Sequence, residues 1–129
     1  MSSVVYLLTL TVYAIGSVIC HQRPERSFYL WSHQMPVCAR CTGIYAGAAV
    51  AVLLSPLVRR LQRKLGRSPW GDPWAGPYAA TGLALTALPA ISTLIYEWTT
   101  GVTPSNAIRA ATGLCLGIGV AALIQREVN

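Results

Sequence analysis

Three of the four cysteines and both histidines lie close together in the chain, between Cys20 and Cys41. Cys38 and Cys41 form a C-x-x-C motif, a spacing at which two thiols can chelate one metal ion or close a small disulfide ring. Cys20 supplies a third thiol, and the imidazoles are those of His21 and His33. The residue types therefore predict a Cys3His site for zinc, made of the three thiols and one of the two histidines.

Which histidine would complete this site is open. The adjacent Cys20 and His21 can bind one ion only across a bent backbone, which makes His33 a serious competitor. A neutral imidazole ligand also needs a second partner that holds it in one tautomer, and Gln22 and Gln34 are candidates for that role. The second C-x-x-C of a zinc ribbon is missing, so the pattern has only moderate specificity.

The same thiols also suit redox chemistry. In that hypothesis Cys38 and Cys41 are the active pair, and Cys20 attacks it to form a mixed disulfide. Arg40 and the start of a helix would favour the thiolate. Four-helix membrane oxidoreductases that pass electrons to quinone share this plan but normally have two cysteine pairs. Here Cys115 falls well inside an apolar stretch, and we expect it to be a small core residue.

The cysteines allow two further interpretations, a structural disulfide and covalent haem attachment. A disulfide between Cys20 and one other cysteine would simply fix the conformation of the loop. Covalent haem attachment requires C-x-x-C-H, and because Thr42 follows Cys41 this possibility is excluded.

The composition is that of a membrane protein. The chain has 129 residues, of which 53% are apolar and only 11% charged, against about 25% charged in soluble domains. Its net charge is +6, but half of the basic residues are concentrated in residues 59–67, between two apolar runs. Such a cluster indicates membrane topology and contact with anionic lipid rather than nucleic-acid binding.

Four apolar stretches approach the ~20 residues that cross a bilayer as a helix; they are residues 3–19, 41–58, 77–98 and 107–124. The sequence thus predicts an all-α integral membrane four-helix bundle, a single transmembrane domain over residues 1–129. Pro56 is expected to end the second helix and Pro89 to kink the third. The first stretch lacks a basic leader and a small-residue cleavage site, which favours a retained helix over a cleaved signal.

Orientation follows from the Lys and Arg content of the short connections. The second connection holds five basic residues, the first holds two with Arg40 at its edge, and the third has one, Arg109, at its edge. We therefore expect the second connection and both termini to be cytoplasmic. The Cys/His-rich loop of residues 20–41 and the loop of residues 99–106 would then share the outer face.

Small residues recur at every fourth position in the second and fourth stretches, and they indicate close helix packing in lipid; they are Gly43, Gly47 and Ala51, and Gly113, Gly117 and Ala121. If these two faces meet, Arg40 and Arg109 lie near the same membrane surface as Glu97. Two expectations for Arg109 stay open: it snorkels to the interface, or it has a buried partner such as Glu97, a loop group or an anion.

Three segments together resemble a prokaryotic family of membrane proteins known as domain of unknown function 2085 (DUF2085): "CHQRPERSF", "PVCARCTGIYAG" and "SNAIRAATG". The resemblance implies a small multi-helix membrane protein with a Cys/His-rich loop, and no stated activity. In the family an acidic residue often follows the proline of the third helix, whereas here the first acid after Pro89 is Glu97. The role of that acid is therefore in doubt here, or has moved to Glu97. The matching positions are Cys20, His21, Gln22, Pro24, Arg26, Ser27, Phe28, Pro36, Cys38, Arg40, Cys41, Thr42, Gly43, Asn106, Arg109 and Gly113.

The leading hypothesis is a multi-pass protein of a prokaryotic cytoplasmic membrane with an outward-facing transition-metal site, most simply zinc. Whether it is an enzyme is open. The alternatives are a thiol-disulfide oxidoreductase coupled to quinone and a non-enzymatic subunit that docks a protein partner. A further alternative is that Arg26, Arg40 and Arg109 hold the phosphate of a lipid substrate. The polar residues expected beside the thiols are Gln22, Arg26, Arg40, Asn106 and Arg109.

Overall fold

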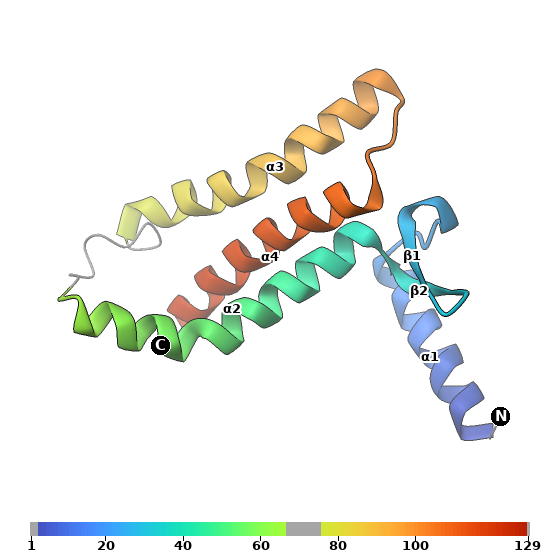
Figure 1. Cartoon of the computed structure of the whole chain (residues 1–129), viewed down its shortest axis with the longest axis horizontal. Helices are drawn as coiled ribbons and strands as arrows, with labels where there is room; N and C mark the ends of the chain where they lie inside the picture. The colour runs from blue at the N-terminus through green and yellow to red at the C-terminus, as the bar shows by residue number, and fades with distance from the viewer. Residues whose placement is uncertain (1–2, 67–75, 129) are drawn as a thin grey trace.

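The structure, a computed structural model, describes residues 3–66 and 76–128 of the chain. Four α-helices account for most of these residues, and a small hairpin separates the first two (Figure 1). The elements are α1 (Ser3–Ile19), a 3-10 turn η1 (Pro24–Arg26), β1 (Ser27–Leu30), β2 (His33–Cys38), α2 (Ala39–Lys64), η3 (Gly76–Tyr78), α3 (Ala79–Thr100) and α4 (Asn106–Glu127).

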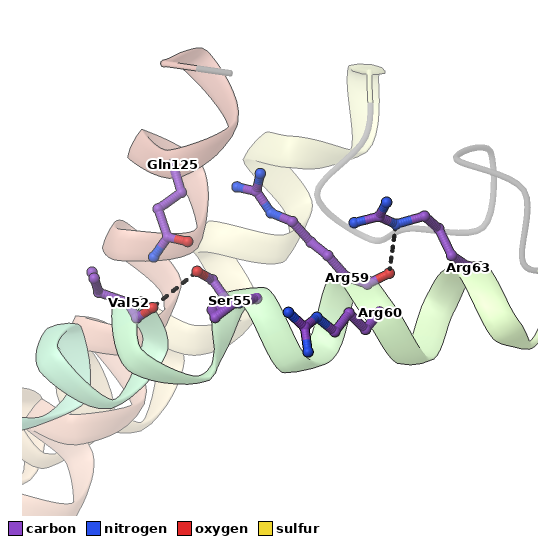
Figure 2. A pocket seen from close by; sticks show the side chains of 7 residues that line it. Val52, Ser55, Arg59, Arg60, Arg63 and Gln125 are labelled. Atoms are coloured by element: carbon purple, nitrogen blue, oxygen red, sulfur yellow. Dashed lines mark hydrogen bonds between the residues drawn. The ribbon is translucent and has the colours of Figure 1, made fainter.

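Helix α2 continues through Pro56 and ends at Lys64, so the prediction that Pro56 ends this helix is wrong. A proline inside a helix has no N–H to donate to the carbonyl four residues earlier, which here is Val52. The Ser55 hydroxyl donates to that same Val52 oxygen at 2.9 Å (Figure 2). A neighbouring hydroxyl thus satisfies the acceptor that the proline leaves free, which is a common remedy in transmembrane helices.

The closest helix packing is between α2 and α4, which run in the same direction (Figure 1). A Cβ atom added at Gly47 would overlap the carbonyl oxygen of Leu114, and one at Gly117 would overlap that of Ile44. Gly43 and Gly113 lie equally close to the facing backbone. The two small-residue faces therefore meet as the sequence predicts, and without side chains between them the backbones approach closely.

Helix α3 packs on a different face of α4 and runs antiparallel to it (Figure 1). Gly119 of α4 lies against the side chain of Thr86 in α3, whereas Gly117 faces α2. Helix α4 is consequently the central helix of the three. The end of α3 and the starts of α2 and α4 lie at the same end of this group.

Helix α1 is attached differently: it points away from the three packed helices and contacts the hairpin (Figure 1). Its single buried residue is Gly16, which lies against the Pro36 carbonyl and the Gln22 side chain. The Tyr13 hydroxyl donates to the carbonyl of Gln34. The predicted four helices are present, and the packing is that of three helices plus one that is held through the loop.

The loop between α1 and α2 contains a two-stranded antiparallel hairpin that the sequence analysis did not anticipate. Its register pairs Ser27 with Cys38 and Leu30 with His33, with an irregularity after Ser27. The turn residues Trp31 and Ser32 both have positive φ angles, of 46° and 66°, which is the left-handed region that tight hairpin turns use. The hairpin brings Cys38 back towards the end of α1.

Three helices are long and apolar enough to cross a membrane by length and composition. They cover Ala39–Lys64, Gly76–Thr100 and Asn106–Glu127. Helix α1 is apolar but shorter, at 17 residues. A membrane normal along α2, α3 and α4 places the hairpin and the turn between α3 and α4 at one surface of the bilayer.

Candidate metal centre and arginine cluster

Three structural elements converge on the cysteines that we call the thiol cluster, namely Cys20, Cys38 and Cys41. Cys20 extends α1 by one residue, since its N–H donates to the carbonyl of Gly16 at 2.8 Å. Cys38 is both the last residue of β2 and the N-cap of α2, and Cys41 lies in the first turn of that helix. All three Sγ atoms lie within 4.8 Å of one another.

This spacing suits a shared metal ion. Zinc binds thiolates at about 2.3 Å in a tetrahedron, which places the sulfur atoms about 3.8 Å apart. The thiols, up to 4.8 Å apart, therefore need only a small inward movement to reach one ion. The set of soft sulfur ligands favours zinc or another thiophilic metal over magnesium or calcium.

Cys20 is the most enclosed of the three thiols, and its surroundings favour the thiolate. Burial by itself raises the pKa of a thiol, but hydrogen bonds from the backbone of Gln22 and Cys38, together with those from the other two thiols, bring the pKa of Cys20 below its ordinary value. The Cys38 N–H lies 3.2 Å from Cys20 Sγ. A thiolate is the form that binds metal and the form that attacks disulfides.

The two histidines differ in their position relative to this cluster. His33 begins β2, whereas Cys38 ends it, so the two are separated by five residues or about 16 Å of extended strand. His21 directly follows Cys20 in sequence, and its side chain is exposed. Within the described part of the chain, neither imidazole joins the group of thiols that lie within 4.8 Å of one another.

The glutamines of the loop hold its backbone. The Gln22 amide donates to the carbonyls of Tyr13 at 2.9 Å and Pro36 at 2.7 Å, and thereby ties α1 to β2. The Gln34 amide donates to the carbonyl of Gln22 at 2.7 Å. Gln22 also has a positive φ of 45°, a strained conformation for a residue with a side chain. Their amide donors thus bond to backbone carbonyls and position the segment that contains Cys20, and not an imidazole.

A second group of polar residues, which we call the arginine cluster, consists of Arg26, Arg40 and Arg109 around Glu97. One oxygen of Glu97 accepts from Arg26 at 2.7 Å and from Arg109 at 2.8 Å. The side chains of Glu97 and Arg109 are only 8% and 5% exposed. Of the two open expectations for Arg109, the structure shows the buried partner, Glu97, which lies in the last turns of α3.

Arg40 joins this cluster from α2. Its guanidinium donates to the Thr93 hydroxyl at 3.3 Å, and Thr93 lies one turn before Glu97 on α3. Asn106, at the start of α4, donates to the carbonyl of the fully buried Ser27 at 3.1 Å. Since Ser27 pairs with Cys38, this bond joins the hairpin that contains Cys38 to the helix that contains Arg109.

The structure therefore gathers the predicted polar residues at one end of the helices, and it adds two that the sequence analysis did not single out for the polar site, Thr93 and Ser27. A hydroxyl one turn before an acidic residue on the same helix was the available signal for Thr93.

Cys115 is exposed on α4 and lies outside the thiol cluster. The expectation that Cys115 is a core residue is wrong, because α4 buries its glycine-rich faces against α2 and α3 and leaves this position outside.

A basic pocket lies at the other end of α2, with a volume of about 500 Å³ (Figure 2). Arg59, Arg60 and Arg63 of α2 line it together with Gln125 of α4. These arginines belong to the segment for which the sequence predicts contact with anionic lipid. The last basic residue of that segment, Arg67, lies outside the described residues.

Comparisons with known proteins agree with the resemblance seen in the sequence. The model of a family described as "Predicted membrane protein (DUF2085)" matches residues 20–123. An uncharacterized protein of Methanothermobacter thermautotrophicus is 39% identical over 110 residues, which cover 83% of this chain and 85% of that protein. Another, from Methanocaldococcus jannaschii, is 45% identical over 53 residues, or 41% of this chain, and the match spans only 34% of that protein's length. No solved structure matches the chain.

Proposed function

We propose that this protein, which belongs to the DUF2085 family of predicted membrane proteins, binds one transition-metal ion, zinc, at Cys20, Cys38 and Cys41. The observation that carries the proposal is the approach of three Sγ atoms to within 4.8 Å of one another, from the end of α1, the end of β2 and the first turn of α2. Thiolates in such an arrangement are strong zinc ligands.

His21 is the better candidate for a fourth protein ligand. It is adjacent to Cys20 in the chain, and its side chain is exposed. His33 would have to cross the length of β2 to reach the thiols. If neither histidine binds, three thiolates leave one position of the ion open to water or substrate, as in catalytic zinc sites.

The metal content of the purified protein tests this proposal. The full chain is purified under reducing conditions in a mild detergent, and zinc per chain is measured by mass spectrometry for the wild type, Cys38→Ser and Cys115→Ser. We expect about one zinc per chain in the wild type and in Cys115→Ser, and less than about 0.1 in Cys38→Ser, because two thiolates bind zinc far more weakly than three. Cys115→Ser is the matched control, since it removes a thiol outside the cluster.

Substitution of cobalt for zinc then identifies the ligands. The visible absorption of tetrahedral cobalt depends on the numbers of sulfur and nitrogen ligands, so His21→Ala should change the spectrum and His33→Ala should not. A wild-type protein that contains no metal but has a reducible bond between Cys38 and Cys41 would refute the proposal. That result would favour the thiol-disulfide alternative, which uses the same residues.

The site is proposed to face the outside of a prokaryotic cytoplasmic membrane. The support is the concentration of basic residues at the end of α2 remote from the thiols, where Arg59, Arg60, Arg63 and Lys64 lie, because such residues favour the cytoplasmic side. The wild-type chain, which has four free cysteines, gives the background labelling by a maleimide that cannot cross the membrane. Relative to that background, His33→Cys, in the exposed hairpin, should gain label in intact cells. Arg63→Cys should gain label only after lysis, and the reverse pattern would invert the orientation.

A further inference from the structure

The arginine cluster contains more positive charge than the structure neutralises. Three guanidinium groups, those of Arg26, Arg40 and Arg109, surround one carboxylate, that of Glu97. Glu97 bonds to two of them, and Arg40 bonds to the neutral hydroxyl of Thr93. The other acid of this region, Glu25, is exposed and lies 3.9 Å from Arg23. An excess of about two positive charges therefore remains around the buried side chains of Glu97 and Arg109, which is unfavourable without a counter-charge.

The same arginines have unused hydrogen-bond donors. The Nε atoms of Arg26, Arg40 and Arg109 are all buried, and none has a partner within the described part of the chain. Arg109 as a whole is only 4% exposed. A buried guanidinium donor without an acceptor is costly, and such groups are normally satisfied by protein, water or ligand.

The three arginines converge on two neighbouring positions of α3, Thr93 and Glu97. Gly113 lies against the backbone of Arg40, and Arg109 lies one turn before Gly113 on α4, so Arg40 and Arg109 start from adjacent turns of two touching helices. Both reach α3, at Thr93 and Glu97, positions that are also one turn, about 5.4 Å, apart. Arg26 approaches the same carboxylate from the loop. The guanidinium groups of the three arginines, which come from α2, α4 and the loop, thus contact α3 within about one helical turn.

We propose that the arginine cluster binds a phosphate group at this end of the helices, with Arg40 and Arg109 as its main ligands and Arg26 covering it from the loop. Guanidinium forks match the oxygen atoms of phosphate in pairs. A phosphate monoester carries about −1.5 to −2 charges near neutral pH, which balances the excess of the cluster. Glu97 fixes Arg26 and Arg109 in place and prevents the site from accumulating a larger positive charge.

Two sources could supply this phosphate: a phospholipid headgroup at the membrane surface or a soluble phosphate. Either would approach from the ends of α2, α3 and α4, where the side chain of Arg26 is 35% exposed. The basic pocket at the opposite end of α2 is a different feature, since it is open and its arginines lie on an exposed helix surface.

Binding is measured by native mass spectrometry of the full-length protein in neutral detergent, with inorganic phosphate and with dioctanoyl phosphatidic acid as probes. Dioctanoylglycerol, which lacks the phosphate, is the control ligand. We expect one phosphate-bearing ligand per chain and a loss of affinity of at least about tenfold, or about 1.4 kcal/mol, in Arg40→Gln. Arg40→Gln is the preferred variant because it leaves both ion pairs of Glu97 intact.

Arg23→Gln is the control, since it removes the same charge at an exposed position in the loop that contains Arg26; its affinity should stay within about twofold of the wild type. Arg40→Lys keeps the charge but loses the fork, and should bind with intermediate affinity. If Arg40→Gln does not fold, Arg26→Gln, whose side chain is 35% exposed, replaces it. Tighter binding of phosphatidic acid than of inorganic phosphate assigns the lipid source, and equal binding assigns a soluble phosphate. Binding of neither probe, or equal binding to the wild type and the folded Gln variant, would overturn the proposal.

Discussion

The thiol cluster and the arginine cluster lie at the same end of the protein, but they are built in different ways. The thiols all come from residues 20–41, and hydrogen bonds of Gln22 and Gln34 within the loop and to the adjoining helix α1 hold their backbone. The arginine cluster draws one residue each from the loop, α2, α3 and α4. The first is a local structure, whereas the second exists only when the three helices are packed.

This difference has a physical consequence. A local site depends on the conformation of a short segment, so it should survive moderate changes in helix packing. A site made of distant residues depends on the close approach of α2 and α4, which the facing glycines permit. Loss of one cluster should therefore leave the other largely intact, and variants that affect a single cluster test this separation.

The largest effect is expected from Glu97→Gln, which breaks the arginine cluster at its centre. It leaves Arg109 buried beside a neutral amide and releases Arg26, and removing one partner of a buried ion pair costs about 3–5 kcal/mol of stability. The free energy of unfolding in mixed detergent micelles measures this loss. Zinc per chain should stay near that of the wild type.

Glu25→Gln is the control for that variant, because Glu25 is an exposed acid of the same charge in the adjoining loop; its unfolding free energy should change by less than about 1 kcal/mol. If Glu97→Gln loses its zinc while it remains folded, the two clusters are not independent.

The opposite case is Gln22→Ala, which should affect the thiol cluster. This change removes the two hydrogen bonds that tie α1 to β2 and so loosens the placement of Cys20 relative to Cys38. Loss of groups that position metal ligands typically lowers metal affinity by about 10- to 100-fold. Competition for zinc with a chelator of known affinity measures the change.

His33→Ala, which alters an exposed residue at the far end of the hairpin, is the control for Gln22→Ala. Phosphate binding should be unchanged in both variants, since no arginine of the cluster bonds to Gln22. An unchanged zinc affinity in Gln22→Ala would show that the thiols keep their positions without the two hydrogen bonds of Gln22.

The two clusters also differ in how much of each could be predicted from the sequence. Thiols separated by two residues in C-x-x-C must lie near each other in almost any fold, so Cys38 and Cys41 could be paired from spacing alone. Cys20 lies beside them only because the chain turns back towards the end of α1. The hairpin, which was not predicted, makes this turn. The strands of the hairpin are short and contain a proline and polar residues, so they lack the alternation of apolar and polar residues that predicts a β-strand.

Contacts between residues far apart in the sequence could be predicted only where the spacing of small residues on two helices indicated that the helices pack together. Small residues at every fourth position led to the packing of α2 against α4, and that packing placed Arg109 near Glu97. The course of α1 could not be read in the same way, because apolar composition shows that a helix avoids water but does not show which surface it contacts. Where α2 continues past Pro56, the Ser55 hydroxyl satisfies the Val52 carbonyl, a local detail that a rule about proline alone does not include.

The smallest effect is expected from Asn106→Ala, which cuts the hydrogen bond between the two clusters. The Asn106 amide donates to the carbonyl of Ser27, a residue that is 1% exposed and paired with Cys38. Its loss should cost about 1 kcal/mol of unfolding free energy, the usual contribution of one such bond, and Thr103→Ala, at an exposed position in the turn before α4, should cost less. The loop keeps the hydrogen bonds of Gln22 and Gln34, and Glu97 keeps its ion pairs with both arginines. The affinities for zinc and for phosphate should therefore each change by less than about threefold. A simultaneous tenfold loss of both would mean that the thiols and the arginines form one site that assembles through this single bond.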